Sequence, residues 1–316
     1  MTIFLLVLGL ALLLAGAEFL VKGAAGLATR LGISPFLIGL TLVGFGTSSP
    51  ELVASLEGAL QGYPGIAIGN VVGSNIANIL LILGISGLVF PLVCDRDALK
   101  RDGTMMLIAA AAMVAVCVYG FLSREAGLAF LAALAVYLVY TYRADKKDKD
   151  GAGALHAAEA EFVTSGRRMG VVIELAMAAG GLVALVIGAS LLVDASVEIA
   201  TKLGVSESVI GLTLVAVGTS LPELATSVLA AFRKKADIAI GNVIGSNIFN
   251  VLGIAGVVAV VKPISIPGDI ASFDVWVMVA ASVLFMIFAW SGARIGRIEA
   301  LLLVAGYGAY TAFLLQ

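Results

Sequence analysis

Ten long apolar stretches are the feature that most constrains how this chain of 316 residues can fold. A helix needs about 20 apolar residues to cross the hydrocarbon core of a bilayer. The chain is 61% hydrophobic and only 13% charged, against about 25% charged for an ordinary soluble domain. We therefore expect an all-α polytopic membrane protein whose ten spans lie near residues 3–24, 34–60, 65–90, 103–121, 125–142, 170–193, 206–231, 238–261, 272–291 and 298–315.

The first stretch is interpreted as a retained span. The small residues 15–17 resemble a signal-peptide cleavage site, but the basic segment that would precede the apolar region of such a signal is missing.

Soft metal ligands and paired thiols do not recur in this sequence. Cys94, Cys117 and His156 show no spacing typical of zinc, haem or a disulfide framework. We expect no cofactor.

Lys and Arg divide unevenly between alternate loops, sixteen on one side and three, Arg124, Lys202 and Lys262, on the other. The side that is richer in Lys and Arg faces the cytoplasm. This rule predicts a protein of the cytoplasmic membrane with both termini outside and a charged cytoplasmic linker at 143–168.

Two sequence blocks recur at a constant offset of 172 residues. GLTLVGFGTSSPEL (39–52) matches GLTLVAVGTSLPEL (211–224), and AIGNVVGSNIANIL (67–80) matches AIGNVIGSNIFNVL (239–252). Five spans separate equivalent points, so the second copy is expected to cross the membrane in the opposite sense. Inverted repeats with helices interrupted by Gly or Pro are typical of secondary transporters that bind their substrate near the bilayer midplane.

The repeat divides the chain into two inverted five-helix halves. The predicted units are an N-terminal half at 1–142 with a first repeat at about 32–90, the linker at 143–168, and a C-terminal half at 169–316 with a second repeat at about 204–262.

A proline followed by a glutamate lies within a span of each half, as Pro50–Glu51 and Pro222–Glu223. Proline removes a backbone donor and leaves a carbonyl unpaired one turn earlier. A carboxylate at bilayer depth is expensive and is a functional candidate by default. The alternative is a buried ion pair with Lys or Arg, but the basic residues fall at span ends and in loops.

Hydroxyl residues stand one turn before each glutamate, as Thr47 and Ser48 or Thr219 and Ser220. At a spacing of four residues, Thr47 would share a helix face with Glu51. Such hydroxyls also bond back to helix carbonyls or soften a proline kink. Their duplication favours a role as cation ligands.

The second block contains a polar stripe at steps of four residues, formed by Asn70, Ser74 and Asn78. Asparagine in a membrane helix often joins helices by hydrogen bonds, a role that we assign to Asn75. Asn78 is interpreted as a ligand. The equivalent positions of the second half are Asn242, Ser246, Asn250 and, for the helix-joining role, Asn247.

These side chains offer carboxylate, amide and hydroxyl oxygens, which are the ligands that hard cations such as Ca²⁺ take. Two glutamates balance one Ca²⁺, and Na⁺ or protons could replace it at the same oxygens. A cation channel could also line a path with such groups, but inverted duplication favours a carrier. A membrane hydrolase would need a nucleophile with a base or a catalytic metal, and the single His156 lies in the linker.

Five other acidic residues have no counterpart in the opposite repeat, so we expect them at helix interfaces or helix ends. They are Glu18, Glu57, Glu174, Asp194 and Glu198.

The paired blocks resemble the two alpha repeats of the Ca²⁺/cation antiporter superfamily, and most closely its bacterial sodium/calcium exchangers. The resemblance implies an antiporter, not an enzyme, in which spans one and six slide past an eight-helix core. It implies Ca²⁺ and Na⁺ as substrates in a lipid bilayer, with no nucleic acid and no obligate protein partner. The implied ion ligands are Glu51, Glu223, Thr47, Ser48, Ser74, Thr219, Ser220 and Ser246, backbone carbonyls near Gly44, Ala216, Thr47 and Thr219, and the amides of Asn78 and Asn250.

Asn250 departs from this pattern, because several sodium-coupled members carry an aspartate at the corresponding position. The departure is also similar to proton-coupled calcium exchangers. Ca²⁺/Na⁺ exchange is therefore the leading interpretation, and Ca²⁺/H⁺ exchange at the same two-glutamate site is the alternative.

Overall fold

The computed structural model describes residues 1–31, 44–94, 96–145 and 170–316. Eight of its helical stretches are long and apolar enough to cross a membrane, and a ninth, Glu207–Phe232, does so if its two segments, bent by 49°, form one span. The remaining predicted span, the second in the chain at 34–60, lies partly outside the described residues. Most of the linker, including His156, also lies outside them. A multi-span helical protein is confirmed, whereas the count of ten stays a prediction.

Within the described residues, the first half runs in sequence through ten helical segments and two very short strands. These are α1 (Thr2–Arg30), α3 (Gly44–Thr47), α4 (Ser49–Gln61), α5 (Pro64–Ala77), the π-helix η2 (Asn78–Leu83), α6 (Gly84–Val89), β1 (Leu92–Val93), α7 (Arg96–Ala98), η3 (Leu99–Gly103), α8 (Thr104–Tyr119), β2 (Phe121–Leu122) and α9 (Arg124–Asp145).

The second half repeats this order closely. Its elements are α11 (Val171–Leu203), α12 (Glu207–Ile210), η4 (Gly211–Val215), α13 (Ala216–Thr219), α14 (Leu221–Phe232), α15 (Ala236–Ile248), η5 (Phe249–Ala255), α16 (Gly256–Val261), β3 (Ile264–Ser265), η6 (Ile270–Asp274), α17 (Val275–Gly292), β4 (Arg294–Ile295) and α18 (Arg297–Leu314).

Two small antiparallel sheets join the halves at the ends of helices. Leu92 pairs with Ile295 between β1 and β4, and Leu122 pairs with Ile264 between β2 and β3. Each pairing therefore takes one strand from each half. Strands of two residues carry no readable alternation of polar and apolar side chains, which is why the sequence did not predict them.

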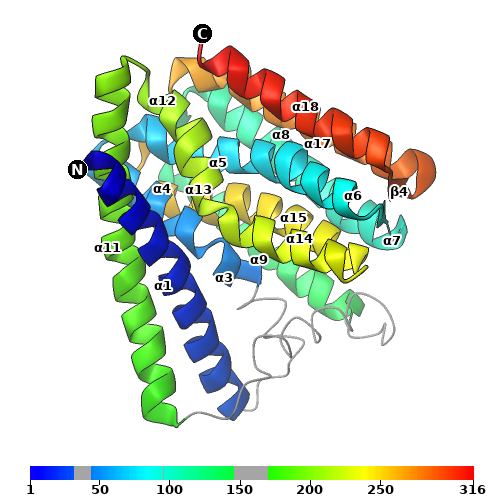
Figure 1. Ribbon diagram of the computed structural model, residues 1–316, viewed down its shortest axis with the longest axis horizontal. Helices are drawn as coiled ribbons and strands as arrows, with labels where there is room; N and C mark the ends of the chain where they lie inside the picture. Colours follow the sequence, from blue (N-terminus) through cyan, green and yellow to red (C-terminus); the bar gives the residue numbers. More distant parts are fainter. Residues whose placement is uncertain (32–43, 95, 146–169) are drawn as a thin grey trace.

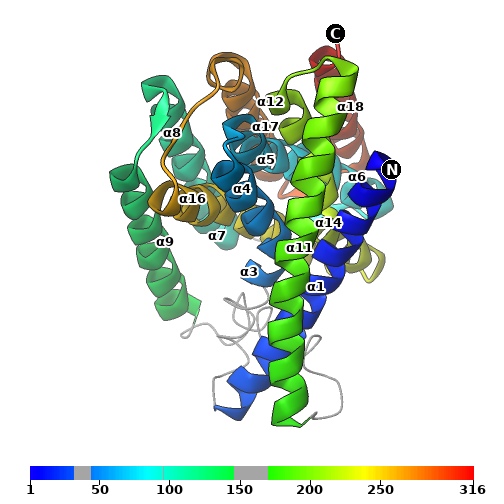
Figure 2. The same ribbon diagram turned by 90° about the vertical axis from the view of Figure 1, so that its left-hand side faces the viewer.

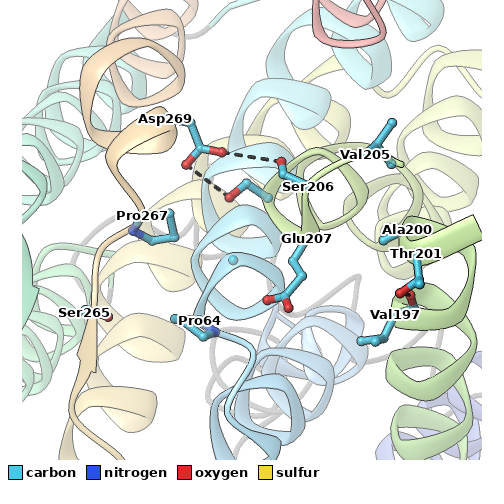
Figure 3. A pocket seen from close by; sticks show the side chains of 12 residues that line it. Pro64, Val197, Ala200, Thr201, Val205, Ser206, Glu207, Ser265, Pro267 and Asp269 are labelled. Atoms are coloured by element: carbon cyan, nitrogen blue, oxygen red, sulfur yellow. Dashed lines mark hydrogen bonds between the residues drawn. The ribbon is translucent and has the colours of Figure 1, made fainter. Parts of the chain in front are cut away.

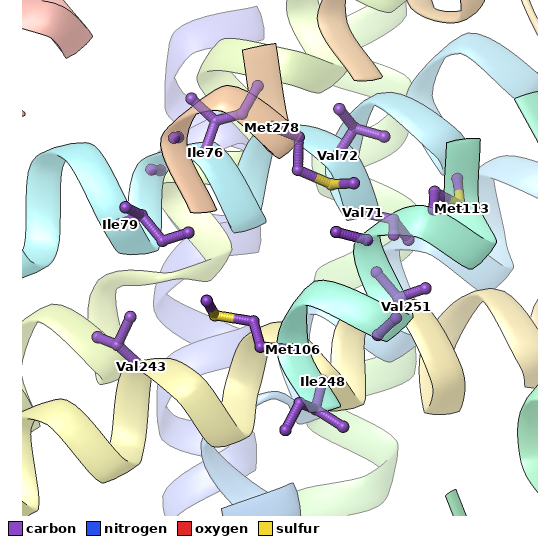
Figure 4. Close-up of a cluster of buried hydrophobic side chains, with 14 of the residues drawn as sticks. Val71, Val72, Ile76, Ile79, Met106, Met113, Val243, Ile248, Val251 and Met278 are labelled. Carbon is purple, nitrogen blue, oxygen red and sulfur yellow. The ribbon is translucent and has the colours of Figure 1, made fainter. Parts of the chain in front are cut away.

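The centre of the molecule is formed by α5 with η2 and by α15 with η5, surrounded by α8, α9, α17 and α18 (Figure 1). Figure 4 shows one part of this core, where Val71 and Ile76 of α5 lie near Met106 of α8 and Val243 of α15. Close packing is possible because small residues line the crossing. A Cβ added at Gly73 of α5 would lie 2.5 Å from the Leu212 carbonyl oxygen of η4.

The two longest helices, α1 and α11, lie side by side along one edge of the bundle (Figures 1 and 2). Gly9 and Gly16 of α1 meet Gly188 and Gly181 of α11, respectively, so the two helices run antiparallel. A Cβ added at Gly16 would lie 2.8 Å from the Gly181 carbonyl oxygen. Glycine is required here because membrane helices approach this closely only through small residues.

Polar contacts close both ends of the α1–α11 pair. Arg30 Nε lies 2.6 Å from Glu174 Oε2 at one end. At the other end, Thr2 Oγ1 donates to Glu198 Oε1 at 2.6 Å, and Lys202 bonds both residues. The prediction that Glu174 and Glu198 occupy helix interfaces is thus in agreement with the structure.

Candidate functional site

The helix that carries each glutamate begins one residue before the proline predicted to interrupt the span. Ser48 and Ser220 form single-residue turns between α3 and α4 and between α13 and α14, respectively. Pro50 and Pro222 then lie in the first turn of the new helix, where a missing N–H costs nothing. Each break places a serine hydroxyl and a glutamate at the start of a short helix within the membrane core.

Both glutamates are buried, and each is held by a serine of the opposite half. Ser48 Oγ donates to Glu223 Oε1 at 2.8 Å, and Ser220 Oγ donates to Glu51 Oε1 at 2.9 Å. The exposed fraction of the residue is 1% for Glu51 and 0% for Glu223. This reciprocal exchange brings the two predicted Pro–Glu motifs, 172 residues apart in sequence, into one site.

The helix break also corrects one prediction about Thr47. Thr47 ends α3, whereas Glu51 belongs to α4, so the two residues do not share the face of one continuous helix. Thr47 instead lies within reach of the Glu223 carboxylate of the other half. The helix is interrupted at Ser48, between the two residues, and a spacing rule for unbroken helices does not apply across that break.

Hydroxyls of the second block complete the surroundings of the glutamates. Ser246 Oγ lies 3.4 Å from Glu223 Oε1 and 3.4 Å from Ser48 Oγ. Ser74 Oγ lies 3.5 Å from the Ala216 carbonyl oxygen. That carbonyl also accepts the backbone N–H of Ser220 at 3.1 Å, so it has a helical partner already.

Gly44 begins α3 at the position that corresponds to Ala216, the first residue of α13. The carbonyl pair predicted from the resemblance thus occupies equivalent places in the two halves. Thr219 differs from the other hydroxyls, because its Oγ1 lies 2.9 Å from the Val215 carbonyl oxygen. This is the back-bonding that was weighed against a ligand role.

Two asparagines fix the backbone of the glutamate helices. Asn70 Nδ2 donates to the Glu51 carbonyl oxygen at 3.0 Å and to Ser55 Oγ at 2.9 Å. The second half repeats both bonds, with Asn242 donating to the Glu223 carbonyl oxygen and to Ser227. The sequence analysis did not identify the two serines as part of the site, although their equivalent places in the repeat were a usable signal.

Four buried side-chain oxygens of this region have no hydrogen-bond partner among the described residues. They are Glu51 Oε2, Glu223 Oε2, Asn78 Oδ1 and Asn250 Oδ1. Unpaired buried polar atoms, and carboxylates above all, are costly unless a ligand or water satisfies them. None of the ion pairs within the described part of the chain involves either glutamate, so the ion-pair alternative receives no support.

The donor set suits a hard cation. Two carboxylates, two amides and several hydroxyls match the oxygen ligands of Ca²⁺ and of alkali cations. The described residues contain no cluster of three or more His, Cys, Asp or Glu side chains.

A cavity of about 610 Å³ opens away from the glutamates, where α11 leads into α12. Figure 3 shows Asp269 at its rim, where the carboxylate accepts from Ser206 Oγ at 3.5 Å and from Ser208 Oγ at 3.1 Å. Because these groups satisfy one another, we regard the cavity as a surface depression and not as the functional site.

The fold and the site together define a polytopic membrane protein with a buried cluster of oxygen-bearing side chains where its two repeated halves meet. The family model described as sodium/calcium exchanger protein matches residues 1–143 and 173–316. The chain therefore belongs to the sodium/calcium exchanger family.

Individual relatives agree with this assignment over nearly the whole chain. The sodium/calcium exchanger MaX1 of Methanosarcina acetivorans is 37% identical, with 98% of this chain and 97% of that protein covered. The inner membrane protein YrbG of Escherichia coli is 35% identical, covering 98% and 95%. The solved structure of the sodium-calcium exchanger NCX_Mj, soaked with Na⁺ and Ca²⁺, matches with a TM-score of 0.64, 33% identity and coverage of 98% and 97%.

Proposed function

We propose that this protein is a secondary active antiporter that exchanges Ca²⁺ for Na⁺ across the cytoplasmic membrane. The observation that carries the proposal is a set of four buried side-chain oxygens, from Glu51, Glu223, Asn78 and Asn250, that have no hydrogen-bond partner among the described residues. Two opposed carboxylates in a dry site need about two positive charges. One Ca²⁺ or several Na⁺ ions meet that need at the same oxygens, which makes their binding mutually exclusive.

The proposed ligand set extends beyond these four groups. We assign the shell to Glu51, Glu223, Asn78 and Asn250, aided by the hydroxyls of Thr47, Ser48, Ser74, Thr219, Ser220 and Ser246 and by carbonyls near Gly44 and Ala216. The names of MaX1 and NCX_Mj support sodium and calcium as the exchanged ions.

The proposed topology is a pair of inverted five-helix repeats with both termini outside and the linker 143–168 in the cytoplasm. The antiparallel packing of α1 against α11 supports inversion, because these helices occupy equivalent places in the two halves. Exchange then proceeds by alternating access, in which the α1–α11 pair moves against the remaining helices. The separate hydrophobic cluster beneath this pair supports such a division.

Ca²⁺/H⁺ exchange at the same site is the second candidate, and Asn250 is the observation that favours it. An amide at this position contributes no charge, so the site has two carboxylates, and two protons would neutralise them as well as one Ca²⁺ does.

The deciding experiment uses purified protein in liposomes and follows uptake of radioactive calcium. One set of vesicles is loaded with Na⁺, and the other carries an equivalent pH gradient without Na⁺. Uptake in the Na⁺-loaded vesicles alone supports Ca²⁺/Na⁺ exchange. Uptake driven by the pH gradient alone reassigns the protein to proton exchange, and no gradient-dependent uptake in either set contradicts the antiporter proposal.

A further inference from the structure

An amide side chain is a useful cation ligand only when its oxygen, and not its NH₂ group, faces the ion. Rotation of an asparagine amide by 180° exchanges the two with almost no change in shape. The orientation must therefore come from the hydrogen bonds around the amide. The two candidate amides of the site, Asn78 and Asn250, differ sharply in this respect.

Asn78 has a partner that holds its NH₂ group. Asn78 Nδ2 donates to Asn247 Oδ1 at 3.0 Å, while Asn78 Oδ1 is buried and has no partner in the described part of the chain. Both residues are at most 2% exposed, so water does not compete for these bonds. The NH₂ group of Asn78 is thus directed toward the opposite half, which leaves its oxygen available to the site.

The orientation of Asn247 is itself fixed by groups that can only accept. Asn247 Nδ2 lies 3.5 Å from the Asn75 carbonyl oxygen and 3.8 Å from the Met106 sulfur. Figure 4 shows Met106 projecting from α8 between Ile79 and Val243, in the crossing of the two halves. A flipped Asn247 would turn its own oxygen toward both of these acceptors, which is unfavourable in a dry interior.

The orientation of each amide is therefore determined by the group before it in a chain of three hydrogen-bonded groups. The Asn75 carbonyl selects the NH₂ group of Asn247, the oxygen of Asn247 selects the NH₂ group of Asn78, and the oxygen of Asn78 is left for the cation. The first group is main-chain and cannot flip, so the direction of the whole chain is determined.

The equivalent chain does not form in the second half. Asn75, the counterpart of Asn247, donates to the Val71 carbonyl oxygen of its own helix at 2.8 Å. Neither amide atom of Asn250 has a partner among the described residues.

We propose that Asn247 is a positioning residue that orients the Asn78 amide so that an oxygen faces the transported cation. This inference rests on the proposed function, because it requires Asn78 to be a ligand. It assigns a distinct role to the first asparagine of the GSNIFN segment, which our sequence analysis interpreted only as a helix-joining residue.

The test measures the apparent KM for Ca²⁺ in proteoliposomes for Asn247→Leu and for the matched variant Asn75→Leu. Asn247→Leu frees the Asn78 amide to rotate and leaves its NH₂ group without an acceptor, so KM should rise about tenfold. Asn75→Leu removes only a bond within one helix and keeps the main-chain carbonyl, so KM should change less than about twofold. Thermal unfolding of each purified variant checks folding, and Asn247→Ala replaces the leucine variant if that protein does not fold.

Repeating the test in the Asn78→Asp variant distinguishes a loss of amide orientation at position 78 from a general loss of packing around position 247. Asn78→Asp presents oxygen in either rotation and has no NH₂ group to satisfy, so adding Asn247→Leu to it should not raise KM. An equal rise in both backgrounds, or no rise in the wild-type background, overturns the positioning role. A wild-type protein without Ca²⁺ transport, or an unchanged KM in Asn78→Leu, would instead overturn the proposed function, and the two failures are therefore distinguishable.

Discussion

The crossing of the two halves is formed by α5 and η2 with α15 and η5. This crossing and the α1–α11 pair both contain several glycines, yet they differ in how much of their surface is buried and in which side chains they enclose. In the segments Pro64–Val89 and Ala236–Val261, 94% and 78% of the apolar window is buried, against 22% for both α1 and α11. The crossing encloses polar side chains from both halves. The α1–α11 pair instead leaves many apolar side chains exposed on its outer side, among them Phe4, Phe19 and Leu182.

The two regions also differ in what holds their helices together. Buried carboxylates and amides need fixed partners, so the crossing is tied by hydrogen bonds between the halves. The α1–α11 contact relies on close approach of backbones at glycines, and the polar contacts described between the two helices lie at their ends. The predictions below probe the two regions in turn.

The largest effect is expected from Glu51→Gln and Glu223→Gln, each of which removes one charge from the crossing at almost constant volume. Loss of one member of a buried charged set costs about 3–5 kcal/mol, so Ca²⁺ exchange should fall at least about 100-fold. The measurement is calcium flux in proteoliposomes.

Glu57→Gln is the matched control. Glu57 lies on α4, the helix of Glu51, and the hydrogen bond described for its carboxylate comes from Gln61 of that helix. Its flux should stay within about twofold of wild type. Wild-type flux in either Glu51→Gln or Glu223→Gln would exclude these carboxylates from the site.

The α1–α11 contact should be sensitive to a single methyl group at Gly181. A Cβ there would lie 2.5 Å from the Leu20 backbone nitrogen and 2.6 Å from the Gly16 carbonyl oxygen, whereas a Cβ at the neighbouring Gly180 meets nothing within 4 Å. Gly181→Ala should destabilise the protein by about 1–3 kcal/mol through overpacking. Gly180→Ala should be neutral or slightly stabilising. Thermal unfolding in detergent compares the two, and equal melting temperatures would refute the close contact.

The serine hydroxyls that cross between the halves should matter for affinity more than for folding. Ser48→Ala and Ser220→Ala each remove one hydrogen bond to a glutamate and one candidate ligand, so the KM for Ca²⁺ should rise about tenfold. Ser86 is a buried serine whose hydroxyl lacks a partner in the described part of the chain, and Ser86→Ala should leave KM unchanged. A similar KM in all three variants would argue that the cross-half bonds do not shape the site.

The smallest effects concern the polar groups at the two ends of the α1–α11 pair. Glu174 is 3% exposed and pairs with Arg30, so Glu174→Gln should cost about 1–3 kcal/mol. The Glu198–Lys202 pair is largely exposed, and Glu198→Gln should cost less than about 1 kcal/mol. Chemical or thermal unfolding ranks the two variants, and the reverse order would show that burial does not govern these contacts.

Much of the fold follows from the sequence because hydropathy and repetition are local or periodic signals. Nine of the ten predicted spans correspond to helices, or to the one bent pair, of the described residues. The short strands and the length of α11, which extends to Leu203 against a predicted end at 193, were not predicted. Helix ends depend on caps and on neighbours that hydropathy does not describe.

By itself, the sequence determined that the protein is a membrane protein with two related halves, each with a Pro–Glu motif and a polar stripe. Those conclusions need only counts, spacing and the cost of charge in lipid. The tertiary structure alone decided that Ser48 bonds Glu223 and Ser220 bonds Glu51, and that Asn247, and not Asn75, holds an amide of the site. The reason is that two copies of a motif can pair within a half or across the halves with the same spacing, and only the packing of the crossing selects between them.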